Sequence, residues 1–378
     1  MARKLGTLTQ VCDNLTNQAC GITSARYIAI NRRNMTAETN ILCLFRVHSI
    51  MKILVSALLA VELCTWNVAY AQRAFKAFGR LQVQPAIQTV DIGNGMVLHY
   101  VDQGEGTPVI FVHGSLSDGG YWADQVGQFA EHYRAIAYSR RYNYPNVNPA
   151  RTGYSAVADA EDLAGFIYAL HLGKVVVIGH SYGALAALFL VANHPELVRA
   201  LVLAEPPAIS LLEHLPGDKA KTGEEMFQDI QRRMVTPMHQ AFLRGDRDAG
   251  IGAFMTYVFN NPHAWDHMTE SARDETLRDA HEWDVMMTAG TLFPDIEPGT
   301  IKKITAPVLL LSGAKSYPFL GLISEELARL LPNREAITLP NAGHQMWYQA
   351  PEVCRKDVET FLGRIGIQPN TINGRGPG

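Results

Sequence analysis

Short apolar runs alternate with amphipathic stretches through most of this chain. Continuous apolar runs are typical of strands buried on both faces of a sheet, and apolar residues at helical spacing are typical of helices packed on one side. Alternating residues on both sides of Gly93-Asn94-Gly95 predict a β-hairpin. Together these patterns predict an α/β fold with a mostly parallel central sheet and helices on both faces. The expected strands are 87–92, 96–101, 108–112, 134–138, 175–178, 200–204, 307–311 and 336–339, and the expected helices are 155–172, 184–192, 320–331 and 351–362.

The pattern changes between residues 207 and 300. Strand-like runs disappear, and Met, Phe, Trp and His become frequent in helical patterns. We interpret 207–300 as a helical cap inserted into a core made of 86–206 and 301–365. Such a cap would lie over the carboxyl ends of the strands, where open α/β sheets bind ligands. Its aromatic and Met residues either line an apolar pocket or, for most of them, form the cap's own small core. The tail 366–378, rich in Asn, Gly and Pro, is expected to be disordered.

The N-terminal part of the chain does not look like the rest. Met51-Lys52, an apolar run at 53–60 and Ala69-x-Ala71 have the order of a bacterial secretory signal peptide, 51–71, cleaved before residue 72. We interpret Met51 as the true start and 1–50 as an upstream, non-native extension. Glu62 interrupts the apolar stretch and argues against a stable membrane span. The expected location is periplasmic or secreted. An uncleaved membrane anchor and a genuine N-terminal extension are the alternatives.

Composition narrows the range of partners. The formal net charge is −3 and no basic run is present, so nucleic-acid binding is not expected. Cleavage after Ala71 would leave Cys354 as the one cysteine of the mature chain and exclude an internal disulfide. His263 and His267 have the spacing of a helical zinc site, but the sequence lacks the glutamate of that motif and an evident third ligand. No metal or other cofactor is predicted, and the oligomeric state stays open.

Gly179-His180-Ser181-Tyr182-Gly183 is the stretch with the strongest chemical signal. It lies between an apolar strand and a helix, the context in which G-x-S-x-G is a nucleophile elbow. A serine in a sharp strand-to-helix turn needs very small residues two positions before and after it. The helix that starts there directs free N–H groups toward any developing negative charge. Ser181 is therefore the predicted nucleophile.

Four motifs in this order resemble the α/β-hydrolases of the large esterase–lyase–dehalogenase group with a helical cap. They are His113-Gly114, the serine motif just described, His194-Pro195-Glu196 and Ala342-Gly343-His344, and the likeness spans about Gln88 to Leu362. The resemblance implies that His344, in the loop after the last strand, is the general base. Imidazole suits this role because it accepts and returns a proton near neutral pH.

The third member of the triad departs from the commonest pattern of the family. Most relatives carry Asp after the penultimate strand, where this chain has Ser316, and a serine cannot stabilise an imidazolium with negative charge. Some members place the acid one strand past the elbow, where this chain has Glu205. A carboxylate at the end of an apolar strand is costly unless it is paired or hydrated, so Glu205 is the predicted acid. Asp295 and Glu325 are weaker candidates because neither follows a strand.

The resemblance also implies an oxyanion hole of two backbone N–H groups. One belongs to Tyr182, and the other to Ser115, with Leu116 as the alternative. A serine nucleophile excludes haloalkane dehalogenase and epoxide hydrolase activity, because it would form an ether that water does not cleave.

The predicted function is therefore that of a serine hydrolase acting on a small or medium carboxylic ester with an apolar part. Hydrolysis of a C–C bond and cofactor-free perhydrolase or chloroperoxidase-like activity on the same triad are alternatives. A ligand-binding receptor without turnover is the alternative from another class, and the absence of Asp at position 316 favours it.

Overall fold

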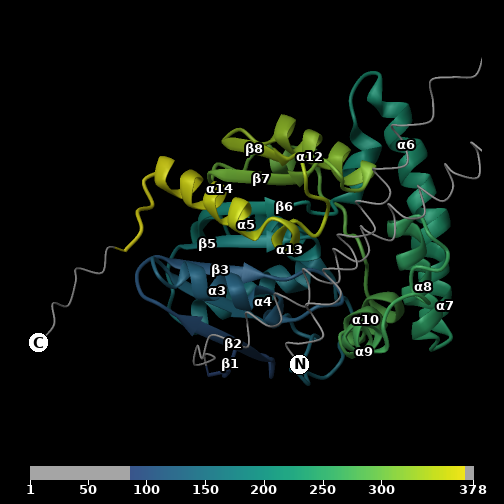
Figure 1. Ribbon diagram of the computed structural model, residues 1–378, viewed down its shortest axis with the longest axis horizontal. Helices are drawn as coiled ribbons and strands as arrows, with labels where there is room; N and C mark the ends of the chain where they lie inside the picture. The colour runs from purple at the N-terminus through teal and green to yellow at the C-terminus, as the bar shows by residue number, and fades with distance from the viewer. Residues whose placement is uncertain (1–85, 371–378) are drawn as a thin grey trace, which may run out of the picture. The chain divides into compact units, whose positions relative to one another are not determined.

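The structure is a computed structural model that describes residues 86–370. The strands within these residues are β1 (Gln88–Asp91), β2 (Val97–Gln103), β3 (Pro108–Val112), β4 (Arg134–Tyr138), β5 (Val175–His180), β6 (Val198–Ala204), β7 (Val308–Gly313) and β8 (Arg334–Leu339). They form one sheet in the order β1-β2-β4-β3-β5-β6-β7-β8 (Figure 1). β2 pairs antiparallel with β1 and β4, and the other neighbouring strands are parallel. The predicted α/β fold is confirmed.

Each central strand contributes side chains to two hydrophobic cores on opposite faces of the sheet. In β3, Val109 and Phe111 belong to one core, whereas Ile110 and Val112 belong to the other. This alternation follows from the two-residue period of a strand. Since both faces are covered, polar side chains have no exposed side to occupy, which explains the continuous apolar runs.

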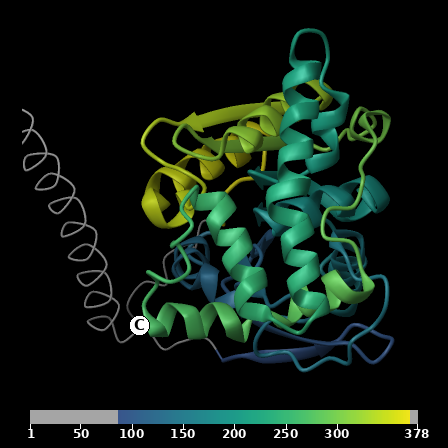
Figure 2. The same ribbon diagram turned by 90° about the vertical axis from the view of Figure 1, so that its right-hand side faces the viewer.

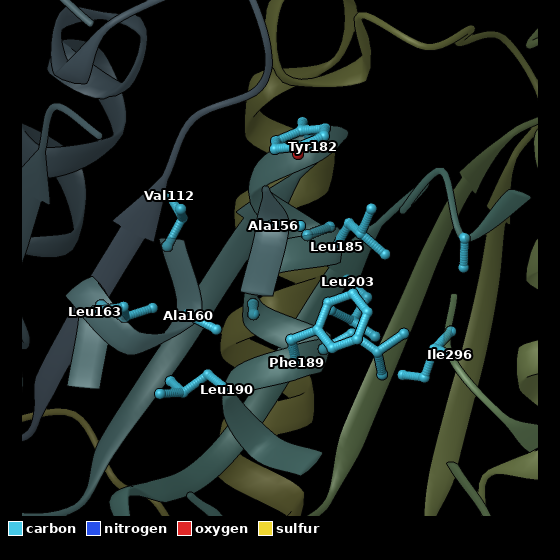
Figure 3. Close-up of a cluster of buried hydrophobic side chains, with 14 of the residues drawn as sticks. Val112, Ala156, Ala160, Leu163, Tyr182, Leu185, Phe189, Leu190, Leu203 and Ile296 are labelled. Carbon is cyan, nitrogen blue, oxygen red and sulfur yellow. The ribbon is translucent and has the colours of Figure 1, made fainter. Parts of the chain in front are cut away.

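Helices cover both faces. The first core, which contains Ile110 and Val112, packs against α4 (Ala156–Ala169), α5 (Tyr182–Asn193) and α12 (Pro318–Leu330). The second, which contains Val109 and Phe111, packs against α3 (Ala123–Phe129) and α14 (Pro351–Arg364). The short helices Gly119–Trp122, Pro195–Leu197 and α13 (Met346–Gln349) complete the core. Figure 3 shows the first core, in which α5 presents Tyr182, Leu185 and Phe189 beside residues of α4. The serine motif thus leads directly into a helix buried between the sheet and its neighbours.

The chain between β6 and β7 contains helices and no strand within the described residues (Figure 2). Its elements are a 3-10 helix (Ile209–His214), α6 (Lys219–Ile230), a π-helical turn (Gln231–Val235), α7 (Thr236–Leu243), α8 (Arg247–Phe259), α9 (Glu270–Arg278), α10 (His281–Ala289) and α11 (Pro298–Ile301). Most of its aromatic and Met side chains are buried together, including Met255, Trp265, Trp283, Met286 and Met287, whereas Phe259 is exposed. We refer to this helical segment as the cap.

The chain after α14 differs from its expected disorder. Ile367 is buried, and the N–H of Asn370 donates to His132 O at 2.7 Å, so 366–370 pack against the core. An apolar side chain at 367 that reaches the second core explains the difference. The predicted signal peptide 51–71 and the extension 1–50 lie outside the described residues. Among residues 86–370, no helix is both long and apolar enough to cross a bilayer.

Candidate active site

Ser181 occupies a sharp turn between β5 and α5. Its backbone has φ 53° and ψ −124°, a conformation that costs a non-glycine residue on the order of 1–3 kcal/mol. The turn depends on two glycines. A Cβ at Gly179 would lie 2.6 Å from Ala184 Cα, and one at Gly183 would lie 2.3 Å from Val112 O. Neither position has room for a side chain, which is the steric requirement that the motif predicted.

Glu205 and His344 are brought together although they are 139 residues apart in the sequence. Glu205 follows β6, the neighbour of β5, and His344 follows β8. His344 Nδ1 lies 2.6 Å from Glu205 Oε2, and the Glu205 side chain is 1% exposed. Because Glu205 also has a positive φ of 49°, both Ser181 and Glu205 hold strained backbone at the ends of adjacent strands.

Two further donors hold the Glu205 carboxylate. Gly313 N–H donates to Oε1 at 2.8 Å, and Ser316 Oγ donates to Oε2 at 2.7 Å. Hydrogen bonds to the ionised form compensate a carboxylate for the loss of water. The serine that replaces the usual acid therefore contacts the carboxylate on the neighbouring strand. The sequence pattern flagged position 316 but did not predict this contact.

His180 links the serine turn to the loop of His344. Its Nε2 lies 2.8 Å from His344 O, and its ring stacks on Tyr121 with 5.3 Å between centroids. Burial lowers the pKa of His180 to about 3, with a smaller contribution from His344. The ring is therefore neutral and donates from Nε2. Within the described residues, Ser181 Oγ makes no hydrogen bond to His344, a contact that is often loose in unliganded hydrolases.

The two predicted oxyanion donors are free of protein acceptors. Among residues 86–370, neither the Ser115 N–H nor the Tyr182 N–H makes a hydrogen bond to the protein. The alternative donor, Leu116 N–H, is engaged by Glu282 Oε1 at 2.5 Å. Leu116 also has a positive φ of 54°, which an apolar L-residue adopts at a cost. Its occupied N–H favours Ser115 over Leu116 as a donor.

A buried ionic cluster contacts the turn that follows β3. Arg140 is fully buried, and it pairs through Nη1 with Asp159 Oδ2 at 2.7 Å and through Nη2 with Glu282. Its Nη2 also donates to Gly114 O at 3.1 Å, and its backbone N–H donates to His113 Nε2 at 2.9 Å. Burial lowers the pKa of His113 well below its ordinary value, so the ring is a neutral acceptor at Nε2.

Sequence reasoning missed this cluster. The one available signal was the pair Arg140-Arg141 just after the apolar strand 134–138. The carboxylate partner of Arg140 in α10 lies 142 residues away, and no local pattern links the two.

The two weaker candidates for the acid of the triad have different surroundings from Glu205. Glu325 pairs with Lys219 on the surface, and Asp295 is an exposed loop residue. The rings of His263 and His267 are tilted by 30° to each other, with 5.6 Å between their centroids. In the described part of the chain, no three His, Cys, Asp or Glu side chains are grouped so as to hold a metal ion. Cys354 is buried, and burial raises the pKa of its thiol to about 12.

The family of the chain follows from comparison with known proteins. The model of the alpha/beta hydrolase family matches residues 109–356, and the chain belongs to this family. One similar protein is 2-(acetamidomethylene)succinate hydrolase from Mesorhizobium japonicum, 28% identical over 279 residues that cover 72% of this chain and 94% of the relative. Another is 2-hydroxy-6-oxo-6-(2'-aminophenyl)hexa-2,4-dienoic acid hydrolase from Metapseudomonas resinovorans, 26% identical over 71% of this chain and 89% of the relative.

Solved structures show the same fold. An alpha/beta hydrolase from Sphaerobacter thermophilus matches with a TM-score of 0.56 and 26% identity, over 73% of this chain and 100% of its own. The enol-lactonase from Burkholderia xenovorans matches with a TM-score of 0.56 and 19% identity, over 74% of this chain and 100% of its own. The relatives include hydrolases of several chemistries, so the family supports a hydrolase, and the substrate has to be argued from the site.

Proposed function

We propose that this protein is a serine hydrolase that cleaves a small or medium carboxylic ester through an acyl-enzyme. Ser181 is the nucleophile, His344 the general base and Glu205 the acid that orients His344. The observation that carries the proposal is the 2.6 Å contact between His344 Nδ1 and Glu205 Oε2 beside a strained serine turn. A serine hydroxyl attacks weakly by itself, and a base oriented by a third group is the arrangement that activates it.

The chemistry follows from the position of each group. Glu205 accepts a hydrogen bond from the Nδ1–H of His344, which leaves Nε2 free to take the proton of Ser181 as its Oγ attacks the ester carbonyl. The negative charge that develops on the carbonyl oxygen is stabilised by the N–H groups of Tyr182 and Ser115. His344 then returns the proton to the alcohol that leaves. In the second half of the reaction, His344 takes a proton from water, which attacks the acyl carbonyl, and the proton is given to Ser181 Oγ as the bond between Oγ and the acyl group breaks.

Hydrolysis of a C–C bond is the second candidate. The observation that favours it is the relative from Metapseudomonas resinovorans, which is named as the hydrolase of a substituted hexadienoic acid. The same nucleophile and base serve both reactions. They differ in the leaving group, which is a carbanion rather than an alkoxide and has to be protonated on carbon.

We also propose that the chain is exported and that its signal peptide is cleaved between Ala71 and Gln72. The support is the order of basic, apolar and small residues between Met51 and Ala71. Expression of the full chain in a bacterium, followed by N-terminal sequencing of the periplasmic and secreted fractions, tests this. A mature N-terminus at Gln72 is expected, and one located before Met51 would refute the proposal.

Fluorophosphonate labelling of the purified full chain tests the nucleophile. Wild type is expected to be labelled on Ser181, and Ser181→Ala and His344→Ala are expected to lose labelling. Ser210→Ala provides a control, because it makes the same change at a buried serine of the cap, whereas Ser181 is half-buried. Turnover of p-nitrophenyl esters of increasing acyl length then reports the acyl pocket. A wild type that is folded but neither labelled nor active on esters would refute the proposal and favour a ligand-binding protein on a hydrolase fold.

A further inference from the structure

Both peptide groups that flank Ser115 are anchored to one buried ion pair. On one side, Gly114 O accepts a hydrogen bond from Arg140 Nη2 at 3.1 Å, beside a second one from His113 Nδ1 at 2.8 Å. On the other side, Leu116 N–H donates to Glu282 Oε1 at 2.5 Å. The remaining oxygen of Glu282 pairs with the same Nη2 of Arg140. One carboxylate and one guanidinium therefore hold the chain before and after residue 115.

This anchoring determines where the Ser115 N–H points. The carbonyl of Gly114 and the N–H of Ser115 belong to a single planar, trans peptide group, so the two point in opposite directions. Because Arg140 and His113 hold the carbonyl, the N–H is directed away from the ion pair. The hydrogen bond of Leu116 fixes the next peptide group and, with it, the rotation at Ser115.

Glu282 is the member of this cluster that comes from the cap. It lies in the first turn of α10 and is fully buried. Burial raises the pKa of its carboxyl to about 7, and Arg140 and the Leu116 N–H oppose that shift. Both oxygens face donors, which is the arrangement expected of an ionised carboxylate rather than a protonated one. A buried charge is thus maintained at the junction of cap and core.

We propose that Glu282 is a positioning residue for the oxyanion hole, because it anchors the Leu116 N–H and Arg140 and thereby orients the Ser115 N–H. The hole is then complete only when α10 of the cap is seated against the turn that follows β3. This inference rests on the proposed function, in which Ser115 supplies one of the two oxyanion donors.

Glu282→Gln is the variant that tests the proposal. Glutamine keeps the shape of the side chain, but it offers one acceptor to two donors, so either Leu116 or Arg140 loses its bond. Removal of an oxyanion donor lowers kcat by about 10²–10³-fold, and misdirection of a donor that is still present is expected to lower kcat by about 10- to 100-fold. The KM for p-nitrophenyl esters is expected to stay within about threefold of wild type, because the donor acts on the transition state.

Asp159→Asn is the matched control. Asp159 is the other carboxylate paired with Arg140 and is equally buried, but it has no hydrogen bond to residues 113–116. Both variants disturb the charge balance of Arg140, so both are expected to lower the melting temperature. Glu282→Gln alone is expected to lower kcat and the rate of fluorophosphonate labelling. If Asp159→Asn lowers kcat as much, or if Glu282→Gln keeps wild-type kcat, the proposal is overturned.

Hydrogen–deuterium exchange of the peptide 113–122 gives a second readout that does not need activity. Faster exchange of this peptide in Glu282→Gln than in Asp159→Asn is expected, and equal exchange overturns the proposal. If wild type is not labelled on Ser181, the proposed function is refuted. The exchange measurement would still test whether Glu282 anchors the turn around Ser115. If Glu282→Gln does not fold, Glu282→Asp replaces it, since aspartate keeps the charge beside Arg140 but is one methylene too short to reach both donors.

Discussion

Glu205→Gln is the substitution that tests the proposed acid of the triad most directly. The carboxylate accepts three hydrogen bonds: Gly313 N–H on Oε1, and the Ser316 hydroxyl and His344 Nδ1 on Oε2. Glutamine has one oxygen and one NH₂ group. If the amide oxygen keeps the hydrogen bond from Gly313 N–H, the NH₂ group faces His344. Nδ1 of His344 then has to accept a hydrogen bond, and the ring proton moves to Nε2. In that tautomer, His344 cannot take the proton of Ser181.

The opposite orientation of the amide has its own cost. It places the NH₂ of the buried side chain at position 205 against the N–H of Gly313, and an unsatisfied buried donor costs about 1–3 kcal/mol. The loss of the carboxylate also removes an ion pair that would stabilise the imidazolium, about 4 kcal/mol for charges about 4 Å apart at an effective dielectric constant of about 20. The two effects add to about 5–7 kcal/mol. At about 1.4 kcal/mol per tenfold, we expect kcat/KM to fall by about 10⁴-fold.

The assay is steady-state hydrolysis of p-nitrophenyl acetate and butyrate, with circular dichroism and thermal melting to verify folding. Glu325→Gln is the control, since it makes the same chemical change at an exposed glutamate that pairs with Lys219. It is expected to leave kcat/KM within about twofold, because exposed ion pairs contribute little. A folded Glu205→Gln enzyme that retains a tenth or more of wild-type kcat/KM would show that the acid is another residue.

Three further predictions concern the same residues. Ser316→Ala removes a donor to the Glu205 carboxylate. Because such a bond contributes about 1.5–3 kcal/mol to stability, the melting temperature should drop by several degrees. An unchanged melting temperature would contradict the role of this contact. Glu205→Gln combined with Ser316→Asp should recover at least about tenfold of the kcat/KM lost in Glu205→Gln, because residue 316 lies beside the Glu205 oxygen that contacts His344. Steady-state kinetics of the single and the double variant, measured side by side, test this. The pKa of His180, about 3 in the folded chain, lies below the unfolded value of about 6.5, so the unfolded state binds the extra proton and stability should fall as pH drops from about 6.5 toward 3. Urea unfolding at several pH values should give a smaller decrease for His180→Gln, and equal pH slopes would show that His180 does not contribute.

The sequence pattern predicted the core of the fold because burial on both faces of a strand leaves a clear mark. Runs such as 108–112 and 175–178 are apolar at every position, and they form β3 and the first four residues of β5. Helix α3 has no comparable apolar pattern in the sequence and was not predicted, since Ala123–Phe129 is short and contains Asp124 and two glutamines. Boundaries also moved by a few residues, as for β8, which begins at Arg334 rather than 336.

The residues of the candidate site could be proposed from the sequence where local motifs indicate their chemistry. Ser181 and His344 belong to short stretches with recognisable neighbours, and Glu205 stood out as a carboxylate at the end of an apolar strand. The support behind them was not predictable. Glu282 meets Arg140 and Leu116 only through the packing of the cap on the core, and Ser316 meets Glu205 across two strands. These contacts depend on the tertiary arrangement, for which a single sequence carries no local signal.

The junction of cap and core also bears on how the molecule unfolds. Arg140 is a core residue, but one of its two counter-charges, Glu282, belongs to the cap. Separation of the cap from the sheet would leave a buried guanidinium half-compensated and would strip Leu116 N–H of its acceptor, and each of these losses costs free energy. A state with an intact sheet and a detached cap is therefore disfavoured. Cap and core behave as one cooperative unit, and truncation of 207–300 would not yield a smaller stable hydrolase core.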